Sequence, residues 1–66
     1  MKLHIDKEAD VLYLRLDESE ITGSEKVSPG VVLDFNDQSQ VVGVEMLHLL
    51  QRSPCLNLDA LQYRTA

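Results

Sequence analysis

The sequence is poor in cysteine, aromatic residues and bases, and each shortage narrows the class of protein. Its 66 residues include one cysteine, Cys55, and no tryptophan. A single cysteine excludes a disulfide framework within the chain and favours a reducing compartment. The six bases are scattered singly, whereas nucleic-acid backbones are bound through clustered Lys and Arg. We therefore expect no direct binding to nucleic acid.

Long hydrophobic runs are also missing. The first ten residues, MKLHIDKEAD, contain no apolar stretch of signal-peptide length, and no other run could span a bilayer. The three glycines lie far apart, so they form no glycine-rich phosphate-binding loop. These absences predict a soluble cytoplasmic protein that does not bind membranes.

Acidic residues dominate the charge. The formal net charge is −5, and the stretch Asp17–Glu25 contains no base. Such a surface keeps a protein in solution as a solvated face, and it can also attract a basic partner protein.

The length allows one domain, residues 1–66. Below roughly 70–80 residues, a single core rarely supplies more than about 3–5 kcal/mol, so such chains often depend on a disulfide, a metal or oligomerisation. Because a disulfide within the chain is excluded, oligomerisation becomes a leading expectation.

Alternation with a period of two predicts β-strands in the first half of the chain. In KLHI, leucine and isoleucine alternate with Lys2 and His4, and in VLYLRL the three leucines alternate with valine, tyrosine and arginine. Pairing Ile5 with Leu12 sets Leu3 opposite Leu14 and keeps one apolar face whole, which a slip of one residue would break. The sequence therefore predicts an antiparallel hairpin with a loop near residues 6–10.

The second half repeats this pattern. The segments VVLDF and VVGVEM flank the turn-forming residues NDQSQ. Pairing Phe35 with Val42 aligns two further apolar pairs, Leu33 with Val44 and Val31 with Met46. Between the two hairpins, SEITGSEKV predicts a middle or edge strand.

Two glycines have a predicted structural role. In Ser28-Pro29-Gly30, proline presets φ and glycine accepts a positive φ, which is typical of a type II turn. Gly43 interrupts a strand, and it marks either a bulge or a place where another side chain crosses closely.

The pattern changes after Met46. Ser53 with Pro54 behind it is one candidate helix start, and Asn57 is the other. Either helix would pack leucines 56, 58 and 61 on the sheet, with Cys55 as a small buried apolar residue. The predicted fold class is α+β: a small antiparallel β-meander of four or five strands with one C-terminal helix packed on one face.

Chemically reactive groups are few. Asp34 and Glu45 fall near each other on one face of adjacent predicted strands, where two carboxylates can act as acid and base or hold a divalent ion. The alternative is a solvated sheet face. His4, His48 and Cys55 lack zinc-site spacing, and Cys55 with His48 lacks the features of a nucleophile pair. We predict no catalytic, cofactor-binding or metal residue, and keep Asp34 and Glu45 as candidates for a polar site.

Three motifs together resemble a known family. DKEADVLYLRL, EKVSPGVVLDF and VVGVEML, in this order and spacing, are similar to the small bacterial family called domain of unknown function 2283, over Ile5–Leu47. The positions that match its pattern are Asp6, Asp10, Tyr13, Pro29, Gly30, Asp34, Gly43 and Glu45. The family has no established activity. Some members lie beside toxin-like genes, so the resemblance implies an antitoxin-like or regulatory role. The apolar tail after Leu47 departs from the family's usual continuation.

The leading functional hypothesis is a non-enzymatic interaction module that self-associates, with a dimer favoured. One sheet face would be covered by the helix, and the other would supply the interface through Val11, Tyr13, Val32, Val41 and Leu47. A second hypothesis is an antitoxin-like partner of a basic toxin protein, bound through Asp17–Glu25. A third is a weak carboxylate- or metal-dependent enzyme that uses Asp34, Glu45 and His4.

Overall fold

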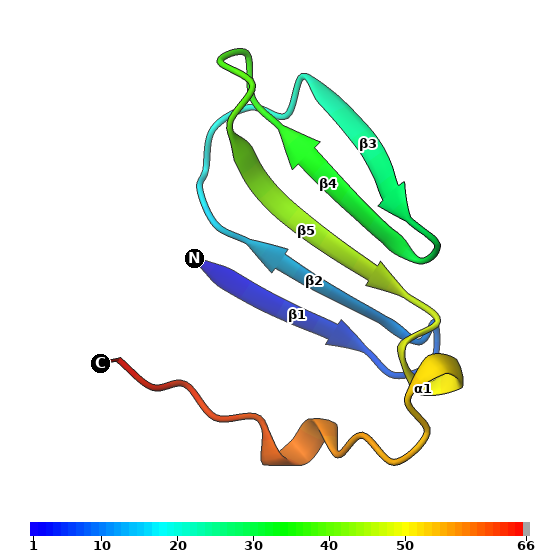
Figure 1. The fold of residues 1–66 in the computed structure, drawn as a ribbon. Helices are drawn as coiled ribbons and strands as arrows, with labels where there is room; N and C mark the ends of the chain where they lie inside the picture. Colours follow the sequence, from blue (N-terminus) through cyan, green and yellow to red (C-terminus); the bar gives the residue numbers. More distant parts are fainter. Residues whose placement is uncertain (66) are drawn as a thin grey trace.

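Five antiparallel strands form the body of residues 1–65, the part of the chain that the computed structural model describes (Figure 1). The strands are β1 (Lys2–Asp6), β2 (Val11–Arg15), β3 (Gly23–Ser28), β4 (Val31–Phe35) and β5 (Val41–Leu47). They are followed by α1 (Leu49–Arg52) and a 3-10 turn, η1 (Leu58–Ala60). The predicted class, an antiparallel sheet with one C-terminal helix, is confirmed.

The strand order is β1-β2-β5-β4-β3, so β5 is central and β1 and β3 are the two edges. Consecutive strands are neighbours except for β2 and β3, because β5 lies beside β2. The connection of residues 16–22 therefore runs from the end of β2 to the far edge (Figure 1). Its backbone is held at both ends: the Leu16 N–H donates to the Val42 carbonyl at 2.8 Å, and the Thr22 N–H to the Phe35 carbonyl at 2.8 Å.

The predicted register holds in most of the sheet. Ile5 pairs with Leu12 and Leu3 with Leu14, as the apolar alternation requires. In the second hairpin Leu33 pairs with Val44, as predicted, but Phe35 pairs with Val41. The predicted pairing of Phe35 with Val42 is wrong because a β-bulge follows Asp34 and adds one residue to β5.

The turn between β3 and β4 has the predicted chemistry. Ser28 pairs directly with Val31, so Pro29 and Gly30 are the two central residues, and Gly30 has φ 79°. A positive φ at the second central position is the mark of a type II turn. The Gly30 carbonyl also accepts the Leu47 N–H at 2.7 Å, which ties this turn to the end of β5.

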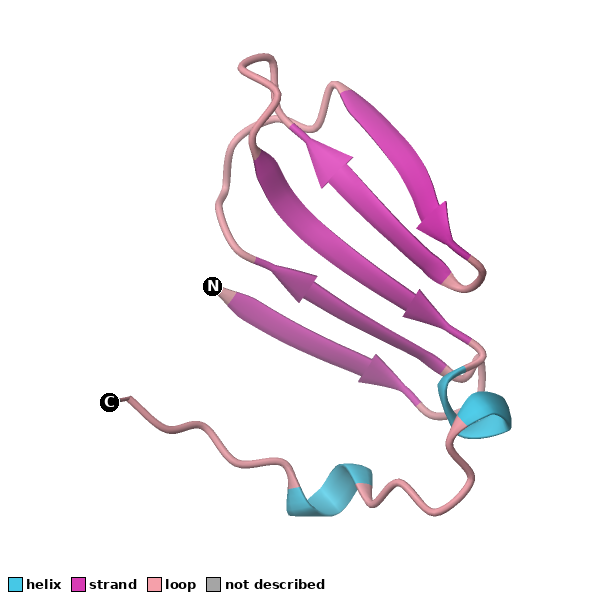
Figure 2. Cartoon of the chain, viewed as in Figure 1, coloured by secondary structure: helices cyan, strands magenta, loops and turns pink. Residues whose placement is uncertain are grey.

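The C-terminal helix is shorter than predicted and lies elsewhere. Ser53, a predicted N-cap, follows the last residue of α1, and most of the chain beyond it is loop (Figure 2). Asn57 does act as a cap, because its side-chain oxygen accepts the Asp59 N–H at 3.1 Å, but it caps only η1. Leu56 and Leu61 are 43% and 57% exposed.

Cys55 is also exposed, so the prediction that it is buried is wrong.

No helix within residues 1–65 has the length and apolar character needed to cross a membrane.

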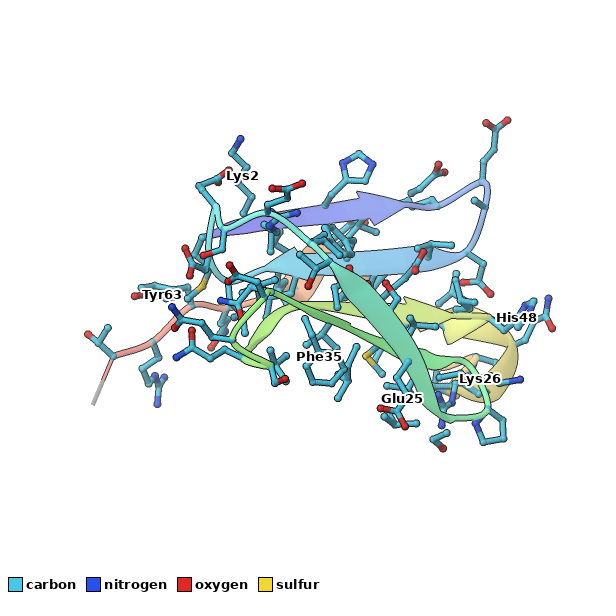
Figure 3. The ribbon with its side chains drawn as sticks, turned by 90° about the horizontal axis from the view of Figure 1, so that it is seen from above. Lys2, Glu25, Lys26, Phe35, His48 and Tyr63 are labelled. Carbon is cyan, nitrogen blue, oxygen red and sulfur yellow. The ribbon has the colours of Figure 1, made fainter. Side chains whose placement is uncertain are left out.

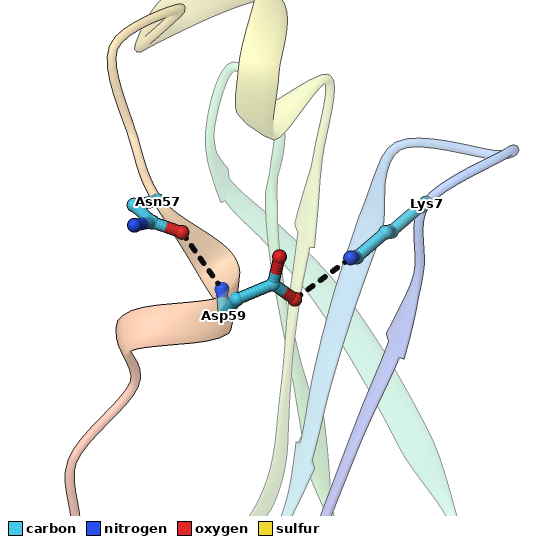
Figure 4. A network of polar contacts seen from close by, with 3 residues as sticks. All are labelled: Lys7, Asn57 and Asp59. Atoms are coloured by element: carbon cyan, nitrogen blue, oxygen red, sulfur yellow. Dashed lines mark hydrogen bonds and ion pairs between the residues drawn. The ribbon is translucent and has the colours of Figure 1, made fainter.

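Residues 53–65, called the tail below, run back beneath β1 toward the N-terminus (Figure 1). A groove of about 680 Å³ separates the tail from the sheet. It is lined by Met1, Leu3, Leu12, Leu14, Leu61, Gln62 and Tyr63. The tail is tied to the β1–β2 loop by an ion pair of 2.8 Å between Lys7 and Asp59 (Figure 4). The Lys7 ammonium lowers the pKa of Asp59, but exposed pairs of this kind stabilise little.

A carboxylate from a distant loop holds α1 in place. His48 occupies the N-cap position, and its side chain makes no capping bond. The Asp10 carboxylate instead accepts the backbone N–H groups of Leu50 at 2.7 Å and Gln51 at 3.3 Å. The Asp10 carbonyl accepts the Leu49 N–H at 3.2 Å. Asp10 thus satisfies the free N–H groups of the first turn from 40 residues away.

Replacing Asp10 tests this anchor. Asp10→Ala removes the acceptor and places alanine at φ 59°, so we expect the free energy of unfolding in urea to fall by about 1–2 kcal/mol. Asp10→Asn keeps an acceptor oxygen and tolerates the left-handed backbone, so its loss should be smaller. An Asp10→Ala protein as stable as wild type would contradict the anchoring role.

Candidate functional site

The most enclosed polar group of the sheet is the carboxylate of Asp34 in β4, which is only 8% exposed. Its Oδ2 accepts the Tyr13 hydroxyl at 3.0 Å, and its Oδ1 accepts the Ser24 hydroxyl at 2.6 Å. Ser24 lies directly opposite Asp34 on β3, whereas Tyr13 comes from β2, on the far side of β5. This carboxylate therefore connects three strands, and both of its oxygens are engaged.

Gly43 makes the Tyr13 contact possible. It lies on β5 opposite Asp34, and the Tyr13 side chain crosses the strand at this point. A Cβ placed on Gly43 would lie 2.6 Å from the Tyr13 hydroxyl and 3.0 Å from Asp34 Oδ2. A side chain at this position would therefore force the tyrosine to shift. Both predicted meanings of Gly43 hold, because a side chain crosses it and the β-bulge directly precedes it.

Glu45, the second carboxylate candidate, shares the face of Asp34. It pairs with Val32 on β4 and with Tyr13 on β2, and it is half-buried. No hydrogen bond links it to Asp34 in the part of the chain that the structure describes. The geometry brings the two carboxylates to one face without joining them into a single site.

The remaining ligand-type residues do not gather. Within residues 1–65 no group of three or more His, Cys, Asp or Glu side chains is placed to hold a metal ion. The buried carboxylate is directed at two hydroxyl groups, and hydrogen bonds to an ionised group stabilise a fold by about 1.5–3 kcal/mol each. These hydrogen bonds therefore hold β2, β3 and β4 together across the sheet.

The sequence indicated Asp34 but not its partners. Tyr13 was predicted as an interface residue and Ser24 had no predicted role, yet both donate to Asp34. Ser24 could have been found by pairing its strand with β4, which sets it opposite Asp34. The tyrosine contact required the strand order, because β2 and β4 are separated in the sheet by β5.

The predicted interface residues lie around this cluster. Val11, Tyr13, Val32 and Leu47 are all half-buried and take positions on the face of Asp34 and Glu45. Val41 is 39% exposed, and the bulge pairs it with Phe35. Their role in an interface stays a prediction.

Gly43→Ala tests the crossing of Tyr13 over β5. The new methyl group would displace the tyrosine, and we expect a loss of about 1–3 kcal/mol in the free energy of unfolding. In a Tyr13→Phe background the closest contact is gone, so the same substitution should cost less, with a coupling of at least about 0.5 kcal/mol. Gly23→Ala is the matched control, because nothing lies within 4 Å of its Cβ position. Additive effects of the two substitutions would contradict the crossing.

Comparison with known proteins gives one match. The sequence pattern of the family described as "Protein of unknown function (DUF2283)" matches residues 2–49. This range contains the whole sheet, the Asp34 cluster and the first residue of α1, and it ends before the tail. No curated protein and no solved structure matched the chain. The resemblance seen in the three motifs is confirmed, and the chain belongs to the DUF2283 family.

Proposed function

We propose that this protein is a non-enzymatic interaction module that associates with a second copy of itself. The observation that carries the proposal is the small amount of apolar surface that one chain buries. Among the apolar residues of the described part, 1–65, only Val42 and Leu49 are buried, with 1% and 6% of their surface exposed. Hydrophobic residues make up 44% of the sequence, so most of them keep part of their surface in water.

The size of the molecule supports this reading. A compact monomer of 7.4 kDa exposes about 4,200 Å², whereas this chain exposes 5073 Å². Its radius of gyration is 12.8 Å, against roughly 11 Å for a compact domain of this length. The excess surface is similar to the roughly 800 Å² that each partner buries in a standard interface. One partner of equal size would therefore account for it.

The exposed apolar side chains are concentrated on one side of the sheet. Within residues 1–65 eight large apolar residues are exposed, and five of them belong to the N-terminus, β1 or the tail. These five are Met1, Leu3, Leu56, Leu61 and Tyr63. Four of them, all but Leu56, line the same groove, and an exposed apolar region of this kind on a small protein is typical of an interaction surface. We therefore assign the contact to this side instead of to the half-buried face around Tyr13.

The exposed thiol supports a reducing location. Cys55 is free and exposed, and such a thiol persists in the cytoplasm, where disulfides are rare. We propose that the module works there.

Sedimentation across a range of concentrations tests the proposal. We expect a species of twice the chain mass of 7.4 kDa at low micromolar concentration. Leu61→Ser should raise the dissociation constant roughly tenfold, because two symmetry-related leucines lose about 1.4 kcal/mol of burial between them. Val27→Ser is the matched control, since Val27 is 49% exposed but lies on β3, at the opposite edge. A monomer at all concentrations, or equal effects of both variants, would contradict the proposal.

A basic protein is a second candidate partner. The connection of residues 16–22 carries the exposed acids Asp17, Glu18 and Glu20. Hydrogen bonds from the Ser19 hydroxyl and backbone N–H lower the pKa of Asp17, so this carboxylate keeps its charge to lower pH. Acidic groups held in this way favour rapid, salt-sensitive association with a basic surface.

Co-purification with the product of a neighbouring toxin-like gene tests the second candidate. We expect a complex at about 50 mM salt that weakens strongly by about 200 mM, since exposed charges are screened over roughly 10 Å. The double variant Glu18→Gln with Glu20→Gln should reduce binding, and Glu8→Gln on the β1–β2 loop should not. Binding that is independent of salt would exclude this acidic contact.

A further inference from the structure

The two edges of the sheet differ in how well they are protected. β3 carries a bulge between Lys26 and Ser28 and is followed directly by Pro29, and both features discourage pairing with another strand. β1 has neither: its five residues pair with β2 in an unbroken register. The unprotected edge is therefore β1.

The outer side of β1 is free to accept a strand. β1 pairs with β2 alone, and no backbone hydrogen bond joins it to the tail within residues 1–65. The tail covers the apolar face beneath β1, where Leu61 meets a groove that also reaches Leu12 and Leu14 of β2. It therefore leaves the strand edge open.

The charged side chains of β1 would face opposite charges if the strand paired antiparallel with a second copy of itself. Lys2, His4 and Asp6 share one face and are all exposed. Lys2 and His4 make no hydrogen bond or ion pair in the described part of the chain. One oxygen of Asp6 accepts the Ala9 N–H at 3.0 Å, and the other is available. Figure 3 shows Lys2 pointing away from the sheet on the β1 side, opposite Glu25 and Lys26.

We propose that β1 pairs antiparallel with β1 of a second copy, about a two-fold axis at His4, so that two sheets join into one. In this register Lys2 faces Asp6 of the second copy twice, and Leu3 faces Ile5 twice on the apolar side. It pairs all five residues of the strand. A register centred on Leu3 sets Lys2 opposite His4, and one centred on Ile5 sets Lys2 opposite Glu8, which lies in the loop after β1. The register centred on His4 pairs Lys2 with Asp6 inside the strand, so we favour it.

The apolar surface beside β1 completes the contact. Met1, Leu3, Leu61 and Tyr63 line or border the groove under the strand. Joining the β1 edges places the two grooves and the two tails next to each other, where their exposed apolar side chains exclude water together. Figure 3 shows Tyr63 at the same end of the molecule as Lys2, which is the end that the partner's Asp6 would approach.

Cysteine cross-linking tests the axis and the register. This inference rests on the proposed self-association, so all variants carry Cys55→Ser and are first shown to sediment as dimers. Opposed residues of antiparallel strands have Cα atoms about 4.5–5.5 Å apart, which a disulfide can bridge. His4→Cys should therefore form an intermolecular disulfide under mild oxidation. Lys2→Cys is the control, because its two copies would lie about 14 Å apart. We expect at least a tenfold difference in rate.

Charge exchange tests the Lys2–Asp6 pairs. Lys2→Glu should raise the dissociation constant roughly tenfold, and Lys26→Glu, the same change on β3, should leave it within twofold. Mixing Lys2→Glu with Asp6→Lys should restore a heterodimer of near wild-type affinity, because both contacts again join opposite charges. If Asp6→Lys fails to fold, Asp6→Asn keeps the acceptor for Ala9 and should weaken the homodimer severalfold.

The outcomes separate the two proposals. Equal cross-linking of the two cysteine variants in a protein that still dimerises would overturn the β1 pairing and leave self-association standing. So would equal effects of Lys2→Glu and Lys26→Glu. A wild-type protein that sediments as a monomer would overturn both.

Discussion

The stability of this protein is limited because little of the chain packs on either face of its single sheet. A single sheet has two faces, and residues 48–65 form a short helix, a 3-10 turn and loop that leave both faces partly exposed. Within residues 1–65 only two apolar residues are buried as a result. Marginal stability in small domains normally depends on the core, so this fold has to draw on other interactions. It uses polar contacts between distant strands, and we propose that it also uses a second copy of the chain.

The polar contacts involve most of the residues by which the sequence resembled the family. Asp34 accepts hydrogen bonds from hydroxyl groups on two other strands. Gly43 leaves room for one of these side chains, the tyrosine, to cross β5. Asp10 caps α1 from a remote loop, and Pro29 with Gly30 forms the turn that is tied to β5. In this chain these residues therefore hold the strands, the turn and α1 together. The tail lies outside the matched range, and it carries much of the exposed apolar surface.

Local patterns predicted the strands well because each register depends on neighbouring apolar residues. The pairing of Ile5 with Leu12 follows from alternation alone, and so does that of Leu33 with Val44. The prediction failed at Phe35, because a bulge after Asp34 adds one residue to β5 that alternation alone does not reveal. It also misplaced the helix, because Ser53 and Pro54 form a good local start signal while the actual cap, Asp10, is remote in sequence. The contact of Tyr13 with Asp34 stayed hidden for the same reason, since it joins two strands that are separated by β5.

If a second copy covers the exposed apolar surface of one chain, the stability of the protein should depend on protein concentration. Urea unfolding measured over about a hundredfold range of concentration tests this most directly. For a dimer that unfolds to separate chains, each tenfold increase adds about 1.4 kcal/mol to the apparent stability, so the midpoint should rise steadily. Unfolding curves that superimpose at all concentrations would contradict the account.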